Sequence, residues 1–306
     1  MGKKSRQAKQ SAKAITNEND DGYPTISVLT PIYNRNKWLP LMVANITTFD
    51  YDKNKLEWFI LDSKDGDEDV RLFPNEMMLE NISRLIHPIK LKYVYIDRKM
   101  TIAEKRTYLT KRMSHKWFAN MDSDDLYFDQ YLKYSVDLCR KNKKQFCGSP
   151  QMIFCWPHRD YEISAIQCSA KRQAHEATFV GTKKYVGSMG YYSRNDEKGE
   201  GSKLVDGNEM NMVKSECKDC MMCICHNRNT CNKDTFIGAN VQNFKAEGTK
   251  LEVLKDIMKQ EVEEGAKNLS QFTIAAPETD KSVVSHKNID KIKDESKRSE
   301  DTETNA

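Results

Sequence analysis

Short apolar segments that end at a proline or an acidic residue recur through the first half of this sequence. The first is TISVLT at residues 25–30, whose β-branched side chains favour a strand and which stops at Pro31, a residue without an N–H to donate. The second segment ends at Asp62 and the fourth at Asp122. A buried strand is therefore predicted at residues 25–30, and further strands at residues 57–61, 91–96 and 116–121.

Helical segments separate these predicted strands. Residues 38–48 carry apolar side chains at helical spacing, and a second helix is predicted over residues 102–113. Strands that alternate with helices form a mainly parallel sheet with helices on both faces. The predicted fold class is therefore α/β, with a Rossmann-like central sheet. Ligands of such sheets bind beyond the carboxyl ends of the strands, where the acidic residues are expected to gather.

Composition divides the chain into a body and two tails. The 306 residues, 38% of them hydrophobic, are enough to bury a sizeable core. Residues 1–22 are Lys-rich and show no hydrophobic period, and residues 275–306 are polar and charged. Both tails are predicted to be disordered because they lack the apolar side chains that a core requires. One folded domain is expected over residues 23–270.

Charge and cysteine content exclude several classes of protein. The 49 basic and 45 acidic residues nearly balance, whereas a dedicated nucleic-acid binder has a strongly basic face. No apolar run is long enough to span a membrane, and no apolar stretch follows the basic N-terminal residues as it would in a secretory signal. Nine cysteines, an odd number, then indicate a reducing compartment. A soluble, cytoplasmic protein is expected.

Three carboxylates follow the fourth predicted strand, at Asp122, Asp124 and Asp125. Carboxylates at this density repel one another unless a cation balances them. Hard oxygen ligands suit Mg²⁺ or Mn²⁺, which commonly bind one or two carboxylates together with substrate phosphates. The alternative is an exposed acidic turn that caps the following helix. The cluster therefore predicts either a divalent metal site or a helix start.

Four segments together resemble the family-two-type glycosyltransferases, nucleotide-sugar-dependent enzymes with the GT-A fold. Residues 28–35 (VLTPIYNR) look like the opening strand and nucleotide-contacting turn of that family, and residues 57–62 (EWFILD) look like its second strand. Residues 101–106 (TIAEKR) resemble the basic helix start before the aspartate motif. Residues 117–125 (WFANMDSDD) are similar to the hydrophobic strand and DxD motif. The order and spacing of the segments carry the resemblance.

The resemblance implies a nucleotide-binding half at residues 23–135 and an acceptor half at residues 136–270. In the first half, Tyr33 would stack on the base of the donor and Asp62 would accept a hydrogen bond from a base N–H. A packing role is the alternative for Tyr33. The implied donor-binding residues are Thr30, Pro31, Tyr33, Arg35, Asp62, Lys105, Arg106, Asp122 and Ser123.

The DxD motif and the nearby basic residues would hold the diphosphate of the donor. Asp124 would bind Mn²⁺ or Mg²⁺ directly, while Asp122 would take a ribose hydroxyl or share the metal. Arg106, with Arg35 or Lys105 near it, would neutralise the phosphates. The alternative for Arg106 is an ordinary cation on the surface of a helix.

A general base is expected at the start of a helix in the acceptor half, and Glu200 is the best match to the family pattern. It lies between two glycines and before a predicted helix at residues 202–205. Glycine neighbours allow the backbone to approach a ligand, and the helix dipole favours an acid at this end. Glu176 and Asp196 are the alternative bases, and a helix-capping role is the alternative for Glu200.

A cysteine-rich segment spans residues 217–231. Its CxxC pair, Cys217 and Cys220, can supply half of a zinc site. Free Cys also behaves as a small apolar residue, so residues 221–225 are more simply interpreted as a buried strand. Residues 225–230 (CHNRNT) are similar to a His-x-x-Asn-Thr signature of the family, which implies that His226 meets the metal or the diphosphate. A core or surface histidine is the alternative.

The combined expectation is a metal-dependent glycosyltransferase of the hexosyltransferase type. It would move a sugar from a nucleoside-diphosphate donor, with UDP-sugar expected, to a hydroxyl of a carbohydrate, lipid or protein, with inversion. An amphipathic helix over residues 249–267 is expected to pack on the body. Two other hypotheses are a nucleotidyltransferase acting on sugar phosphates, although the glycine-rich phosphate loop of that class is missing after residues 25–30, and a Cys-rich zinc-binding interaction module.

Overall fold

The computed structural model describes residues 22–64, 71–167, 174–193, 199–229, 232–240 and 248–272. The chain separates into two compact units, Met1–Gln260 and Glu261–Ala306. Both predicted tails lie outside the described residues except for Gly22, and so do Asp196 and Cys231.

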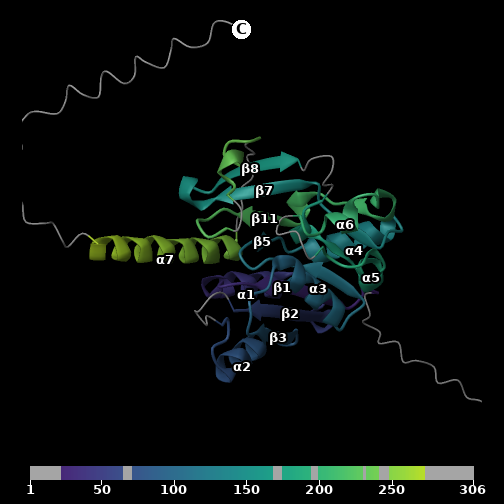
Figure 1. Cartoon of the computed structure of the whole chain (residues 1–306), viewed down its shortest axis with the longest axis horizontal. Helices are drawn as coiled ribbons and strands as arrows, with labels where there is room; N and C mark the ends of the chain where they lie inside the picture. The colour runs from purple at the N-terminus through teal and green to yellow at the C-terminus, as the bar shows by residue number, and fades with distance from the viewer. Residues whose placement is uncertain are drawn as a thin grey trace, which may run out of the picture. The chain divides into compact units, whose positions relative to one another are not determined.

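A seven-stranded sheet forms the centre of the first unit, in the order β10-β6-β9-β4-β1-β2-β3. Figure 1 labels β1, β2 and β3 of this sheet. Its pairs are parallel except those of β9, which is antiparallel to β4 and β6. The predicted mainly parallel α/β sheet is therefore confirmed. The strands are β1 (Ile26–Ile32), β2 (Leu56–Ser63), β3 (Lys90–Ile96), β4 (Trp117–Asn120), β6 (Phe146–Gly148), β9 (Val180–Thr182) and β10 (Val213–Lys214).

Strand β1 continues through Pro31, where the sequence predicted that it would stop. The carbonyl of Leu29 accepts a hydrogen bond from the N–H of Met121, so the backbone polar groups of Leu29 point toward β4. Pro31, two residues later, faces the same side. The ladder with β4 ends at the pair of Leu29 and Asn120, so the missing N–H of Pro31 leaves no bond of that ladder unmade.

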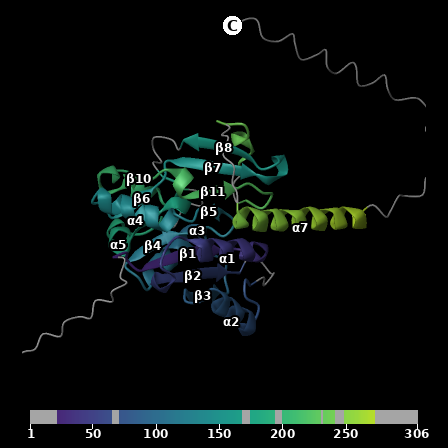
Figure 2. The ribbon, with the colours of Figure 1, turned by 180° about the vertical axis from the view of Figure 1, so that it is seen from behind.

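Helices cover both faces of the central sheet, as predicted, and two separate apolar clusters hold them there (Figures 1 and 2). Val28 of β1 belongs to the cluster that contains α1 and α4, whereas its neighbour Leu29 belongs to the cluster that contains α3, α5 and α6. The alternation of side chains along a strand produces this division. The helices are α1 (Leu39–Thr48), α2 (Glu76–Leu85), α3 (Ile102–Arg112), α4 (Tyr131–Lys141), α5 (Lys183–Met189) and α6 (Ser202–Val205).

The start of α3 is fixed by a capping box. The hydroxyl of Thr101 accepts a hydrogen bond from the N–H of Glu104, and the carboxylate of Glu104 accepts one from the N–H of Thr101. Two N–H groups that the helix leaves without partners are satisfied in this way. The capping box therefore sets the register of α3 and with it the position of Arg106 in the helix.

A second sheet of four strands, in the order β5-β11-β7-β8, was not predicted from the sequence. Its β11 is buried at all four residues, which confirms the buried strand expected within residues 221–225. The helix predicted at residues 249–267 is also present, and its side chains Leu254 and Ile257 are buried in the first unit. The bounds are β5 (Leu126–Tyr127), β7 (Gln151–Trp156), β8 (Glu162–Gln167), β11 (Met221–Ile224) and α7 (Thr249–Phe272).

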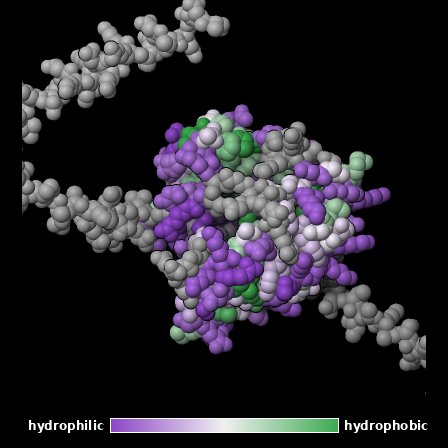
Figure 3. Space-filling model, viewed as in Figure 1, coloured by the Kyte–Doolittle hydropathy of each residue, from purple (hydrophilic) through white to green (hydrophobic). Residues whose placement is uncertain are grey.

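The face of the molecule in Figure 3 is mainly hydrophilic and carries small hydrophobic patches. Large exposed apolar side chains include Met77, Leu85 and Met210. None of the helices in the described segments combines the length and the apolar character that crossing a bilayer requires. Short 3-10 helices lie at Asn36–Trp38, Lys53–Lys55, Pro157–Arg159, Glu176–Thr178, Glu209–Asn211, Cys217–Asp219 and Asp234–Phe236.

Candidate functional site

The predicted site residues of the first half gather at the carboxyl ends of β1, β2 and β4. The three strands are parallel neighbours, with Ile32 of β1 opposite Asp62 of β2 and Leu29 of β1 opposite Asn120 of β4. The turn after β4 carries Asp122 and Asp124, two and four residues beyond Asn120. The parallel register therefore places the end of β2 and the acidic turn on either side of the end of β1.

Arg106 connects the acidic turn to the predicted base. Its Nη2 donates to Asp122 Oδ1 at 2.8 Å, and its Nε donates to Glu200 Oε1 at 2.8 Å. The side chain of Arg106 is only 4% exposed. Burial works against its charge, but Asp122 and Glu200 outweigh burial and raise the pKa of Arg106 above its ordinary value. Its third nitrogen, Nη1, is buried and has no hydrogen-bond partner within the described segments.

Asp122 is held from two directions. Its N–H donates to the hydroxyl of Tyr127 at 2.8 Å, and that hydroxyl donates to the carbonyl of Ala177 at 3.1 Å. Burial raises the pKa of the Asp122 carboxyl, while Arg106 opposes the shift and the charge of Asp124 adds to it. The position of the Asp122 carboxylate is thus determined by Arg106 on one side and by its own backbone on the other.

Asp124 accepts two hydrogen bonds on the same oxygen. Arg35 Nε donates to Oδ2 at 3.0 Å, and His226 Nε2 lies 3.1 Å from that atom. The imidazole Nδ1 accepts from the N–H of Arg228 at 3.2 Å, so the ring proton is on Nε2, which donates to Asp124. Burial alone would raise the pKa of Asp124, but His226 and Arg35 hold it well below its ordinary value.

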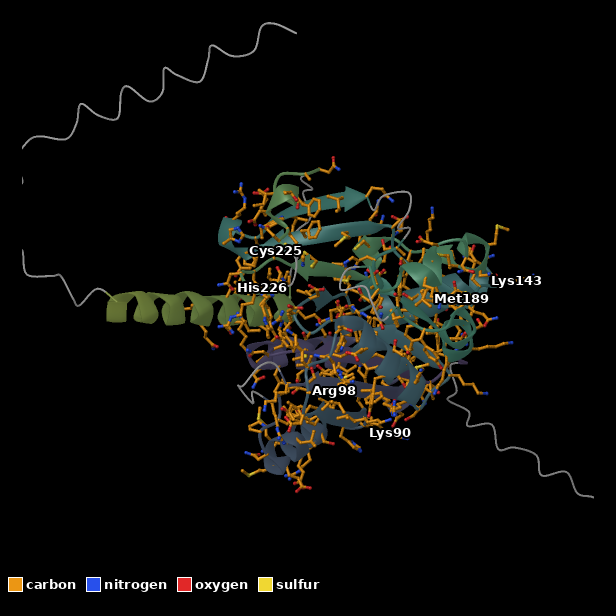
Figure 4. All side chains as sticks on the ribbon, viewed as in Figure 1. Lys90, Arg98, Lys143, Met189, Cys225 and His226 are labelled. Carbon is orange, nitrogen blue, oxygen red and sulfur yellow. The ribbon has the colours of Figure 1, made fainter. Side chains whose placement is uncertain are left out.

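The structure brings His226 to the acidic turn; its predicted contact with the metal or the diphosphate stays a prediction. It follows β11 directly after Cys225, as Figure 4 shows, and its ring lies 4.7 Å from that of Trp38 between centroids. The guanidinium of Arg35 also donates to the carbonyl of Arg228 at 2.9 Å. The turn after β11 is thus tied to both the acidic turn and the end of β1.

The third carboxylate of the cluster, Asp125, points into the protein. Its Oδ1 accepts from the N–H of Ile224 at 3.0 Å, and its carbonyl accepts from Asn45 Nδ2 at 2.8 Å. Burial and the charge of Asp124 raise the pKa of Asp125 to about 7. Nearby, Lys233 Nζ donates to Cys223 Sγ at 2.7 Å. Asp125 therefore joins the acidic turn to β11 and leaves Asp122 and Asp124 to face the site.

The donor atoms of the acidic turn fit a hard divalent cation. No group of three or more His, Cys, Asp or Glu side chains is placed to hold a metal in the described parts of the chain, which include Cys217, Cys220, Cys223 and Cys225. Mg²⁺ and Mn²⁺ commonly need only one or two carboxylates when substrate phosphates complete the shell. Asp124 Oδ1 accepts no hydrogen bond from any described residue, so this oxygen is available to an ion.

Asp62 ends β2 with one occupied oxygen and one unused oxygen. Oδ2 accepts from the N–H of Leu72 at 2.9 Å and from the hydroxyl of Tyr93 at 2.9 Å. Oδ1 is buried and has no partner among the described residues. Burial raises the pKa of Asp62, against the opposing effect of these hydrogen bonds. A buried acceptor without a donor is costly, which makes Oδ1 a natural contact for a ligand N–H.

The remaining predicted donor-binding residues line or support the end of β1. Lys105 donates through Nζ to the carbonyl of Ile32, and Nζ lies 5.1 Å from the ring centroid of Tyr33. Thr30 is fully buried and its hydroxyl accepts from Trp58 Nε1 at 2.9 Å. Pro31 and Ser123 are also buried. The half-buried ring of Tyr33 is thus the surface that β1 offers to a ligand.

Glu200 lies immediately before α6, in a segment shaped by its glycines. Gly199 adopts φ of 74°, which favours glycine, and Gly201 N–H donates to Glu176 Oε1 at 3.2 Å. A Cβ on Gly201 would lie 2.6 Å from the ring of Phe179, so only glycine fits at this position without moving that ring. Burial and the charge of Glu200 raise the pKa of Glu176 to about 7. Glu200 Oε2 accepts no hydrogen bond from the described residues.

Two side chains at the site were not identified from the sequence. Tyr93 lies within the predicted strand at residues 91–96, but its contact with Asp62 depends on the pairing of β3 with β2. Trp38 lies within a predicted helix, and its contact with His226 joins segments far apart in the chain. A polar tip on an otherwise apolar strand was the only available signal for Tyr93.

A mainly parallel sheet with helices on both faces and an acidic turn at its carboxyl edge agrees with the GT-A fold that the sequence resemblance implied. The sequence model described as glycosyl transferase family 2 matches residues 27–199, more than half of the chain. The chain belongs to this family. No curated protein sequence matches the chain.

Solved structures with similar folds share little sequence with this chain. S. aureus TarS 1-349 in complex with UDP is 12% identical with a TM-score of 0.48, covering 66% of this chain and 60% of its own. The same protein in complex with UDP-GlcNAc is 12% identical with a TM-score of 0.49, and the match covers 76% of this chain and 65% of that one. The mannosyltransferase PcManGT from Pyrobaculum calidifontis, in complex with GDP-Man and Mn²⁺, is 16% identical with a TM-score of 0.48. The match covers 67% of this chain and 58% of that one. The match therefore spans less than two thirds of each of these chains.

Proposed function

We propose that this glycosyltransferase transfers a hexosyl group from a UDP-sugar to an acceptor hydroxyl with inversion, using a divalent metal and Glu200 as general base. The observation that carries the proposal is the pair of 2.8 Å contacts from Arg106 to Asp122 and Glu200. One buried guanidinium joins the DxD motif to the predicted base. In this proposal the donor-binding residues and the base belong to one site, although Asp122 and Glu200 lie 78 positions apart in the sequence.

Uracil is the base that the end of β2 fits best. Asp62 Oδ1 is an acceptor with no partner among the described residues, and the imide N–H of uracil is a donor. Tyr33 follows Ile32, which pairs with Asp62 in the sheet, and its ring lies near Lys105; it would stack on the base. The donor is accordingly proposed to be a UDP-sugar.

The diphosphate would lie over the acidic turn. Asp124 would hold Mn²⁺ or Mg²⁺ through its unused Oδ1, with Asp122 facing the ribose or the ion. When bound, the ion would act as a Lewis acid that stabilises the negative charge of the leaving diphosphate. His226 donates through Nε2 to Asp124, and it would hold that carboxylate in place rather than ligate the ion through this nitrogen.

Glu200 would act on the acceptor. Its Oε2 is unpaired among the described residues and would accept the proton of the acceptor hydroxyl. The hydroxyl oxygen would then form a bond to the anomeric carbon as the bond between that carbon and the diphosphate oxygen breaks. Attack from the side opposite to the leaving group inverts the anomeric carbon. The acceptor would be a hydroxyl of a carbohydrate, a lipid or a protein.

A comparison of Glu200→Gln with Glu176→Gln tests the base. Turnover of a UDP-sugar, followed as UDP release with Mn²⁺ and an acceptor panel, is expected to fall by about 10²-fold or more in Glu200→Gln, because Gln cannot take the proton. The affinity for UDP is expected to stay the same. Glu176→Gln is the matched control, because Glu176 lies beside Glu200 but its Oε1 accepts a hydrogen bond from the N–H of Gly201. Wild-type turnover in Glu200→Gln would remove Glu200 as the base.

The metal is tested separately from the base. Chelation of divalent ions is expected to abolish UDP release by the wild type, and Asp124→Ala is expected to stay inactive when Mn²⁺ is added back. Asp125→Asn offers no control, since Asp125 supports β11. Equal UDP release by the wild type with Mn²⁺, by the wild type with chelator and by Asp124→Ala would show that the reaction needs no metal at this turn.

A further inference from the structure

The two oxygens of the Asp62 carboxylate are in different states. Oδ2 accepts from Leu72 N–H at 2.9 Å and from the Tyr93 hydroxyl at 2.9 Å, which uses both of its lone pairs. Oδ1 is buried, carries two lone pairs and has no partner in the described segments. Asp62 itself is fully buried. The carboxylate therefore presents one acceptor atom to a ligand and not two.

We infer that Tyr93 determines the base specificity of the donor site, by occupying Asp62 Oδ2 so that the carboxylate accepts a single N–H. The inference rests on the proposed nucleotide-binding function of this site. It extends that function because it names the residue that separates uracil from guanine. Tyr93 acts through Asp62 and is a positioning residue.

The two bases present different donors to a carboxylate. Uracil has one N–H, at N3, flanked by two carbonyl groups. Guanine presents two adjacent donors, N1–H and the N2 amino group, which pair with both oxygens of a carboxylate. With Oδ2 already occupied, the second donor of guanine would be buried without a partner. Sites that leave a buried polar group unpaired discriminate strongly against the ligand that carries it.

Tyr93 is held in place from several sides. Its strand, β3, pairs with β2, with Tyr93 opposite Ile60 two residues before Asp62. Its ring meets Phe73 edge to face, with centroids 4.8 Å apart. Burial and the charge of Asp62 raise the pKa of the Tyr93 hydroxyl, so that it remains a neutral donor. The hydroxyl cannot leave Oδ2 without losing its own partner, which keeps the oxygen occupied.

The experiment compares the affinities of the intact protein for UDP and GDP before and after Tyr93→Phe. Titration calorimetry with Mn²⁺ is expected to show a wild type that prefers UDP. Tyr93→Phe keeps the ring on Phe73 but frees one lone pair of Oδ2, so the ratio of the two affinities is expected to narrow about tenfold. A purely structural effect would weaken both nucleotides equally and leave the ratio unchanged, which would overturn the inference.

Tyr23→Phe is the matched control. The Tyr23 hydroxyl donates to Asp137 Oδ2 at 2.7 Å, so this variant also removes a hydrogen bond from tyrosine to aspartate, at a position outside the donor site. Its ratio is expected to equal that of the wild type. If Tyr93→Phe does not fold, wild-type binding of 3-methyl-UDP replaces it. Loss of about tenfold or more relative to UDP supports recognition of the imide N–H, and equal affinity overturns it.

The outcome for the wild type separates this inference from the proposed function. A wild type that binds neither UDP nor GDP contradicts the proposed function itself. A wild type that binds UDP, together with a Tyr93→Phe variant of unchanged ratio, contradicts only the role of Tyr93. A narrowed ratio supports both.

Discussion

A single guanidinium holds together the two carboxylates on which the proposed chemistry depends. Arg106 contacts Asp122 through Nη2 and Glu200 through Nε, and its side chain is 4% exposed. The charges of Arg106 and Glu200 are costly to remove from water, the side chain of Asp122 is 24% exposed, and mutual hydrogen bonds offset the cost. Removal of the arginine would leave the buried carboxylate of Glu200 and the partly buried one of Asp122 without a counter-charge. Arg106 therefore matters to stability as well as to the geometry of the site.

Arg106→Met is expected to lower the free energy of unfolding by about 3 kcal/mol, in the range found when one partner of a buried ion pair is removed. Urea unfolding followed by circular dichroism measures the change. Arg84→Met is the control, because Arg84 makes an exposed pair with Glu80 at 3.1 Å. Its cost is expected to stay below about 1 kcal/mol. Equal losses of unfolding free energy in the two variants would show that Arg106 stabilises the protein no more than a surface arginine does.

At the scale of elements, the close packing of Gly201 shapes the segment that presents Glu200. Gly201 lies against Phe179 and Glu176 so closely that no side chain fits between them. Phe179 leads into β9, the antiparallel strand of the central sheet. The contact of Gly201 with Phe179 therefore fixes the position of Glu200 relative to the central sheet.

Gly201→Ala is expected to destabilise the protein by about 1–3 kcal/mol, because its Cβ would lie 2.6 Å from the Phe179 ring and 2.7 Å from Glu176 Cγ. Gly187→Ala should have the opposite sign. Gly187 lies in α5, and the nearest atom to its added Cβ is 3.6 Å away, so alanine should stabilise the helix by about 0.5–1 kcal/mol. Chemical denaturation of both variants tests the pair, and a neutral Gly201→Ala would show that Phe179 can move.

The sequence predicts local elements better than the contacts between them. The strands that became β1, β2 and β4 are visible as apolar segments because burial on both faces of a parallel sheet demands such runs, whereas β3, at the edge of the sheet, is only half-buried. The second sheet is not visible, because β5 has two residues and its partner β11 lies far along the chain. The contact of Tyr93 with Asp62 and the inward turn of Asp125 likewise depend on pairing that no local pattern encodes.

At the scale of the whole molecule, the candidate site lies where the two sheets of the first unit meet. Asp124 and Asp125 follow the central sheet, whereas Ile224 ends β11 of the second sheet and His226 follows it. Asp125 accepts from Ile224 N–H at 3.0 Å and Asp124 accepts from His226. A ligand held at the acidic turn would therefore contact groups from both sheets and stabilise the unit as a whole.

UDP with Mn²⁺ is accordingly expected to raise the melting temperature of the protein. A ligand at about 100 times its Kd adds about 2.7 kcal/mol by mass action, which corresponds to a rise of roughly 5–10 °C for a domain of this size. Differential scanning calorimetry measures the shift. In Asp124→Asn the part that depends on Mn²⁺ should disappear, because the neutral side chain is a weaker ligand for a hard cation.

Lys133→Met is the matched control for this experiment, since Lys133 pairs with Asp50 at 3.1 Å away from the acidic turn and its side chain is 43% exposed. Its shift with UDP and Mn²⁺ should equal that of the wild type. A wild-type shift of the same size with UDP alone would show that the acidic turn holds the nucleotide without a cation. In that case Asp124 Oδ1, the atom proposed to bind the ion, would instead accept a hydrogen bond from the nucleotide.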